Sequence, residues 1–102
     1  MIQEKPLASW QKKALDAVAP AINNFAQVHK GHVQASGNEI SVRASANGHY
    51  VTVQVGVFGK SDDVKLEITG LNQRGIETKH IVFKFTELNM DEFSKALEKT
   101  LV

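Results

Sequence analysis

The chain contains no cysteine, which excludes disulfides, thiolate zinc sites and thiol nucleophiles and fits a reducing compartment. Its charges nearly cancel, with a formal net charge of +1, so no overall field steers it toward nucleic acid or anionic lipid. No apolar run approaches the ~20 residues that cross a bilayer, and Met1–Pro6 lacks the basic-then-apolar pattern of a signal peptide. We therefore expect a cytoplasmic protein without a membrane segment.

The composition is otherwise that of an ordinary globular domain, with 42% hydrophobic and 23% charged residues in a chain of 102. This length is close to the commonest domain size and is sufficient for an independent core. Residues 1–102 are therefore expected to form a single domain.

Apolar residues recur at steps of three and four in the first third of the chain and predict an amphipathic helix. Pro6 suits the first turn of this helix, and Gly31 after Lys30 is a favourable stop. Pro20 either bends or breaks the helix, and a bend is favoured because the stripe keeps its phase through it. The stripe comprises Leu7, Trp10, Ala14, Ala17, Val18, Ala21, Ile22, Phe25 and Val28.

Strict apolar/polar alternation then predicts four strands, near 39–46, 49–58, 64–69 and 78–86. A polar turn follows Phe58, and a longer loop covers Gly70–Gly75. Asn47-Gly48 is the strongest short hairpin signal, and a two-residue turn there opposes apolar residues throughout the first hairpin. The predicted pairs are Ala46 with His49, Ala44 with Val51, Val42 with Val53 and Ile40 with Val55. His32–Ala35 is a candidate fifth strand.

A second helix follows, with Asn89 as its cap and acidic residues in its first turn. Its predicted apolar face comprises Met90, Phe93, Ala96, Leu97 and Leu101. Because only one sheet face is apolar, both helices should cover it. The predicted fold is a two-layer α+β domain, with an antiparallel meander of four or five strands, a bent N-terminal helix and a short C-terminal helix.

The chemistry-bearing residues are sparse. The pairs His29/His32 and Asp62/Asp63 lack further ligands at metal-binding spacing, and His49 and His80 are each interpreted as a surface polar residue and not a base. We predict no metal, no cofactor and no catalytic residue. An enzyme that uses His49 or His80 in a cleft between helix and sheet remains an alternative, as does a small-molecule-binding protein.

The uncovered sheet face is the predicted functional surface, with Arg43, Tyr50, Gln54 and Lys84 as candidate partner-binding residues. Gly56 on this face predicts a β-bulge, or else close contact with a partner. The strand-prone run His80–Phe85 is expected at a sheet edge, where strand addition is available. We therefore predict a small non-catalytic intracellular protein that binds another protein, or a second copy of itself, as a subunit, adaptor or inhibitor.

The open face also has the polar-plus-aromatic character of a platform for single-stranded nucleic acid, with Tyr50 and Phe58 as stacking residues. This alternative is disfavoured because the acidic residues of the face offset its basic ones and the two aromatics lie at opposite ends of one strand.

Overall fold

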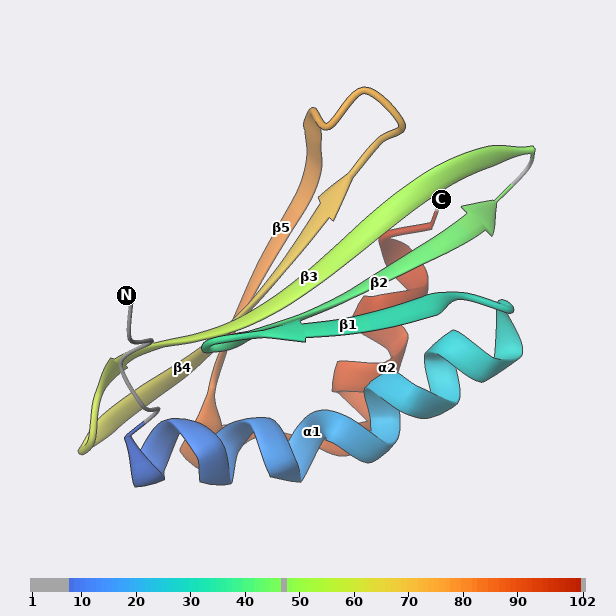
Figure 1. Cartoon of the computed structure of the whole chain (residues 1–102). Helices are drawn as coiled ribbons and strands as arrows, with labels where there is room; N and C mark the ends of the chain where they lie inside the picture. Colours follow the sequence, from blue (N-terminus) through green and yellow to red (C-terminus); the bar gives the residue numbers. More distant parts are fainter. Residues whose placement is uncertain (1–7, 47, 102) are drawn as a thin grey trace, which may run out of the picture.

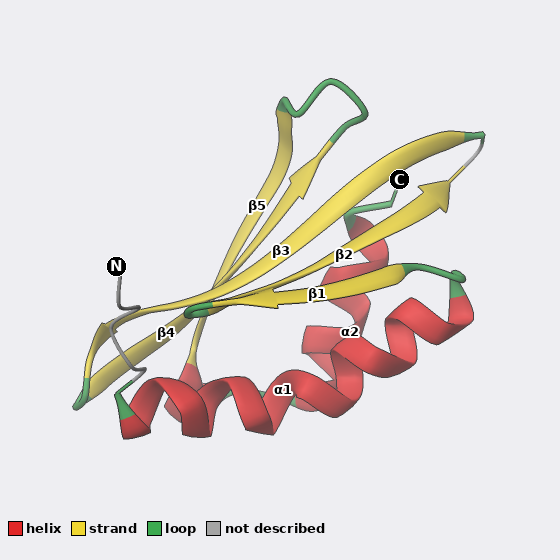
Figure 2. Cartoon of the chain, in the orientation of Figure 1, coloured by secondary structure: helices red, strands yellow, loops and turns green. Residues whose placement is uncertain are grey.

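A five-stranded antiparallel sheet with two helices on one face forms the protein (Figures 1 and 2). The computed structural model describes residues 8–46 and 48–101. The strands follow one another in the order β1-β2-β3-β4-β5, so the sheet is the predicted meander and the fifth strand is present. The elements are α1 (Ser9–Val28), β1 (His32–Ser36), β2 (Glu39–Ala46), β3 (His49–Lys60), β4 (Asp63–Leu71), β5 (Glu77–Lys84), the 3-10 turn η1 (Phe85–Glu87) and α2 (Met90–Lys99).

The β2–β3 hairpin has the predicted register. Val42 pairs with Val53 and Ile40 with Val55, so each apolar side chain opposes another on the helix-covered face. The following turn is tighter than predicted, because β3 continues to Lys60 and β4 begins at Asp63. Gly59 permits this, since its φ is 101° and a β-carbon there would collide with the Asp63 carbonyl oxygen.

α1 is one continuous helix through Pro20, and Figure 1 shows it bending in its middle to follow the sheet. A bend, not a break, is therefore the outcome. Pro6 and Leu7 lie outside the described residues. The buried stripe is rotated from the predicted one, because Leu15 and Ala26 are buried whereas Ala17 and Val28 are exposed.

The exit from α1 differs from the prediction. The Lys30 N–H donates to the Gln27 carbonyl and the Gly31 N–H to the Ala26 carbonyl, at 3.3 and 2.6 Å, which is the Schellman pattern. The left-handed residue is Lys30, with φ 53°, and not Gly31. Gly31 is required for another reason: a β-carbon there would lie 2.7 Å from Cγ1 of buried Val42.

The last strand also ends earlier than predicted. β5 stops at Lys84, and Phe85 opens the 3-10 turn while still packing against the core. The side chain of Asn89 then caps α2 as predicted, accepting from the Asp91 and Glu92 N–H groups at 2.9 and 3.3 Å. Met90, assigned to the apolar face of α2, is instead exposed.

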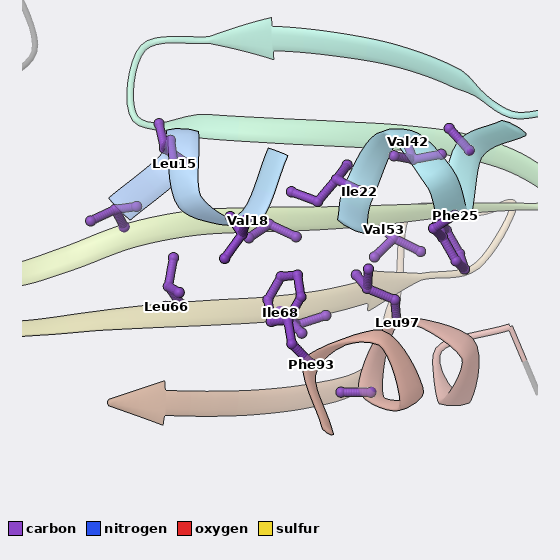
Figure 3. Packing of buried hydrophobic residues seen from close by; sticks show 14 of the residues in the cluster. Leu15, Val18, Ile22, Phe25, Val42, Val53, Leu66, Ile68, Phe93 and Leu97 are labelled. Carbon is purple, nitrogen blue, oxygen red and sulfur yellow. The ribbon is translucent and has the colours of Figure 1, made fainter. Parts of the chain in front are cut away.

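The core lies between the two helices and the face of the sheet that they cover (Figure 3). Phe93 of α2 is fully buried and its ring centroid lies 6.0 Å from that of Phe83 in β5. Thr100, at the end of α2, lies close to Gly70 of β4: a β-carbon on Gly70 would lie 3.2 Å from Cβ of Thr100. The buried hydrophobic residues are Ala14, Leu15, Val18, Ile22, Phe25, Ala26, Val42, Ala44, Val53, Val55, Val57, Leu66, Ile68, Phe93, Ala96 and Leu97.

Candidate functional site

The open face of the sheet places the four predicted partner-binding residues in three separate regions. Arg43 and Tyr50 contact each other at one end of the β2–β3 hairpin. Gln54 lies in the middle of the face, opposite Ser41 and Thr69. Lys84 lies on β5 opposite Lys65, at a different corner. The face therefore does not form one site.

The first region is the Tyr50 end. The Arg43 guanidinium carbon lies 4.8 Å from the centroid of the Tyr50 ring, a cation–π contact that orients both side chains. His32 of β1 is directly opposite Arg43 in the β1–β2 register. Together with Lys30 at the exit of α1, these residues line a shallow depression of about 380 Å³.

A second depression, of about 350 Å³, adjoins the first because Tyr50 lines both. Its other wall is the loop between β4 and β5, where the Asn72 side-chain oxygen accepts from the N–H groups of Arg74 and Ile76 at 2.9 and 3.0 Å. His49 reaches Gln73 of the same loop at 3.2 Å. The lining comprises His49, Tyr50, Val51, Asn72, Gln73, Arg74 and Ile76.

Neither depression has a carboxylate in its lining. Within residues 8–46 and 48–101, the close contacts between basic side chains and carboxylates form elsewhere: His29 with Glu98 at 2.8 Å, Lys65 with Asp63 at 3.6 Å, and His80 with Glu67. Lys30, Arg43 and Arg74 thus have no carboxylate within ion-pairing distance in the described part of the chain. Three basic side chains without a carboxylate in the lining thus border the two depressions that share Tyr50.

The centre of the open face is occupied by Gly56, which pairs with Glu39 on one side and Glu67 on the other. The predicted bulge at Gly56 is wrong, because the register passes through it without interruption and the irregularity lies at Gly70/Leu71. The absent side chain leaves a small depression of about 140 Å³. His80 contacts Glu67 beside it and is exposed.

The third region is the edge formed by β5 and α2. β5 is the last strand of the sheet, and Val82 on its open face is 47% exposed. On the opposite face, Ile81 and Phe83 line a groove of about 290 Å³ against α2. The α2 wall carries Glu92, Lys95, Ala96 and Lys99.

The remaining candidates of the sequence do not gather into a site. The side chain of His29 is only 24% exposed, and it joins α1 to α2 through Glu98. Across the described residues, no three histidine or carboxylate side chains come together as metal ligands would. Neither described helix combines the length and the apolar character required to cross a bilayer.

Sequence reasoning missed the residues that come to Tyr50 from other elements. Lys30 is at a helix exit, His32 is on an edge strand, and Arg74 is in a loop, so no shared periodicity connects them. The available signal was topological: in a meander, the α1 exit, the β2–β3 turn and the β4–β5 loop lie at the same end of the sheet. Comparisons with protein-family models, curated proteins and solved structures find no match to this chain.

Proposed function

We propose that this protein is a non-catalytic intracellular binding protein whose partner adds an extended segment to the edge strand β5. The observation that carries the proposal is the combination of an edge position with an adjoining groove. An added strand would bond to the backbone groups of β5 that β4 does not use. Every second side chain of that strand would then point into the groove between β5 and α2.

The chemistry of the groove supports a particular class of segment. Ile81 and Phe83 are half-buried and offer apolar contacts. Lys79, two residues before Ile81, shares their side of the strand, and α2 adds Lys95 and Lys99. Glu92 is the one acidic residue in the groove lining. The matching partner is a segment of another protein that alternates apolar residues with Asp or Glu.

Selection from a random linear peptide library displayed on phage tests this without knowledge of the natural partner. Selected peptides are expected to carry apolar residues two positions apart and an excess of acidic residues. Hydrogen exchange of the complex should slow the amides of β5 and leave those of β1, the other edge strand, unchanged. The absence of enriched peptides, or protection confined to β1, would contradict the proposal.

A matched pair of charge reversals locates the contact. Lys95→Glu with Lys99→Glu should weaken the selected peptides about tenfold, because two attractive charges become repulsive. The control is Lys12→Glu with Lys13→Glu, two exposed lysines on α1, which should leave the affinity unchanged. Equal losses in both variants would indicate non-specific charge attraction.

The edge strand β5 could instead pair with a second copy of this chain. Light scattering at micromolar concentration tests for such a dimer. A monomer mass is expected. A dimer mass with β5 amides protected in the dimer would replace the proposed partner with a second copy and overturn the heterotypic proposal.

A further inference from the structure

The Tyr50 end has no role in strand addition at β5, yet basic side chains and no carboxylate line its two depressions. Lys30, Arg43 and Arg74 bring three permanent positive charges to the two depressions that share Tyr50. His32 and His49 add ring N–H donors. Because the ion pairs of the described residues lie elsewhere, these cations are available to an anion.

An aromatic surface accompanies the charge. Tyr50 is 56% exposed although it is a large ring, and Ile76 in the second depression is also 56% exposed. The Arg43–Tyr50 contact holds the two flat groups together at 4.8 Å. Proteins stack nucleic-acid bases on both aromatic rings and guanidinium planes.

The backbone conformation of Lys30 is evidence that its side chain has a binding role and not a structural one. This residue occupies the left-handed position at which helices usually place glycine. A lysine there is disfavoured for the fold, but this residue lines the first depression together with His32 and Arg43. Strain of this kind is a recognised feature of functional sites.

From these observations we propose that the Tyr50 end binds a nucleotide unit, either free or within a single strand. The base stacks against the Arg43–Tyr50 pair, and phosphate oxygens accept hydrogen bonds from Lys30, Arg43 and Arg74. The net charge of +1 for the whole chain does not reveal this site, because it says nothing of where the charges lie, and neither depression has a carboxylate in its lining. Gly56 and its flanking glutamates, in the middle of the face, limit the site to one end of the sheet.

Fluorescence anisotropy of labelled oligothymidylate, eight nucleotides long, at 50 mM salt tests the proposal. Binding is expected and should weaken roughly 18-fold between 50 and 200 mM salt, as three phosphate contacts with a single strand imply. Unlabelled thymidine monophosphate distinguishes the source of the ligand. Displacement at a similar concentration supports a free nucleotide, and displacement only by the oligonucleotide supports a strand.

Three variants assign the contacts. Tyr50→Leu keeps a strand-compatible apolar side chain but removes the stacking ring, and should weaken binding about tenfold. Lys30→Gly should weaken binding about threefold while the thermal midpoint of unfolding stays the same or rises, which a purely structural lysine would not do. Lys84→Ala, at another corner of the open face, is the control and should bind like the wild type.

The results that overturn the proposal are equally defined. One is the absence of an anisotropy change at 50 mM salt. Another is displacement by inorganic tripolyphosphate as effective as by the oligonucleotide, combined with full binding by Tyr50→Leu, because charge alone would then explain the attraction. A loss in Lys84→Ala as large as that in Lys30→Gly would show that the contacts are spread over the whole face.

Discussion

Two neighbouring substitutions at the exit of α1 should change stability in opposite directions. Lys30 has the left-handed backbone, φ 53°, whereas Gly31 approaches β2 closely. The usual sequence rule assigns the left-handed position to the glycine and would predict that Gly31→Ala is harmful through its backbone and that Lys30→Gly is harmful as a second glycine. The structure predicts a different pair of effects.

For Lys30→Gly, removal of a side chain from the left-handed region relieves roughly 1–2 kcal/mol. The greater freedom of glycine in the unfolded chain offsets about 0.5–1 kcal/mol of this. The net expectation is a gain of about 0.5–1 kcal/mol in the free energy of unfolding. For a domain of this size, 1 kcal/mol corresponds to roughly 4–8 °C in the thermal midpoint.

For Gly31→Ala, the new methyl group would lie 2.7 Å from Val42 Cγ1 and 3.1 Å from the Arg43 carbonyl oxygen. Val42 is 1% exposed and β-branched, so it has little freedom to move away. Overpacking of this kind costs about 1–3 kcal/mol, and the lower entropy of the unfolded alanine chain returns about 0.4–1 kcal/mol. The net expectation is a loss of about 1–2 kcal/mol.

Urea denaturation followed by the fluorescence of Trp10, the single tryptophan, measures both free energies. Gly56→Ala is the matched control, since the nearest atom to its new β-carbon is the Asn38 carbonyl oxygen at 4.0 Å. That variant should be neutral or slightly stabilising. A Gly31→Ala protein as stable as the wild type, or a Lys30→Gly protein less stable than the wild type, would refute this account of the helix exit.

Two further substitutions test the packing of α2 by the same assay. Asn89→Ala removes the side-chain acceptor that caps the helix and should lower the free energy of unfolding by about 1 kcal/mol; an unchanged value would mean that the cap contributes nothing. Phe93→Ala leaves a cavity among Phe83, Leu97 and the sheet and should lower it by about 3–5 kcal/mol; a loss below about 1 kcal/mol would contradict the placement of α2 on the core.

The parts of the fold that sequence predicted are those in which two independent signals agree. In the β2–β3 hairpin, the alternation of valines and the two-residue turn each require Val42 to oppose Val53. A slip by one residue would move every apolar side chain to the wet face, so the energy gap to the wrong register is large. The stripe of α1 is a weaker constraint, because a helix can rotate slightly on a sheet and exchange Ala17 for Leu15 in the core.

The parts that sequence missed depend on distances between segments far apart in the chain. A glycine can be needed for a bulge, for a left-handed turn or for close packing of another segment against the backbone, and the position of the neighbouring element determines which of these applies. Gly31 is needed because β2 lies over it, whereas Gly56 interrupts no pairing. Phe85 was assigned to β5 because its apolar side chain continued the alternation, yet it reaches the core equally well from a 3-10 turn.

The same reasoning explains why the sequence predicted only some of the residues at the Tyr50 end. Arg43 and Tyr50 follow from alternation on paired strands, because the register sets them diagonally across β2 and β3. The cations that give the pair a function come from a helix exit and a loop, whose side chains no periodicity places. A sum of the charges on the strands alone therefore includes the glutamates at the middle of the sheet and omits the cations that the helix exit and the loop add at its end. Since Coulomb attraction of an exposed ligand decays within about 8–10 Å at physiological salt, the local arrangement and not the sum over the face decides what can bind there.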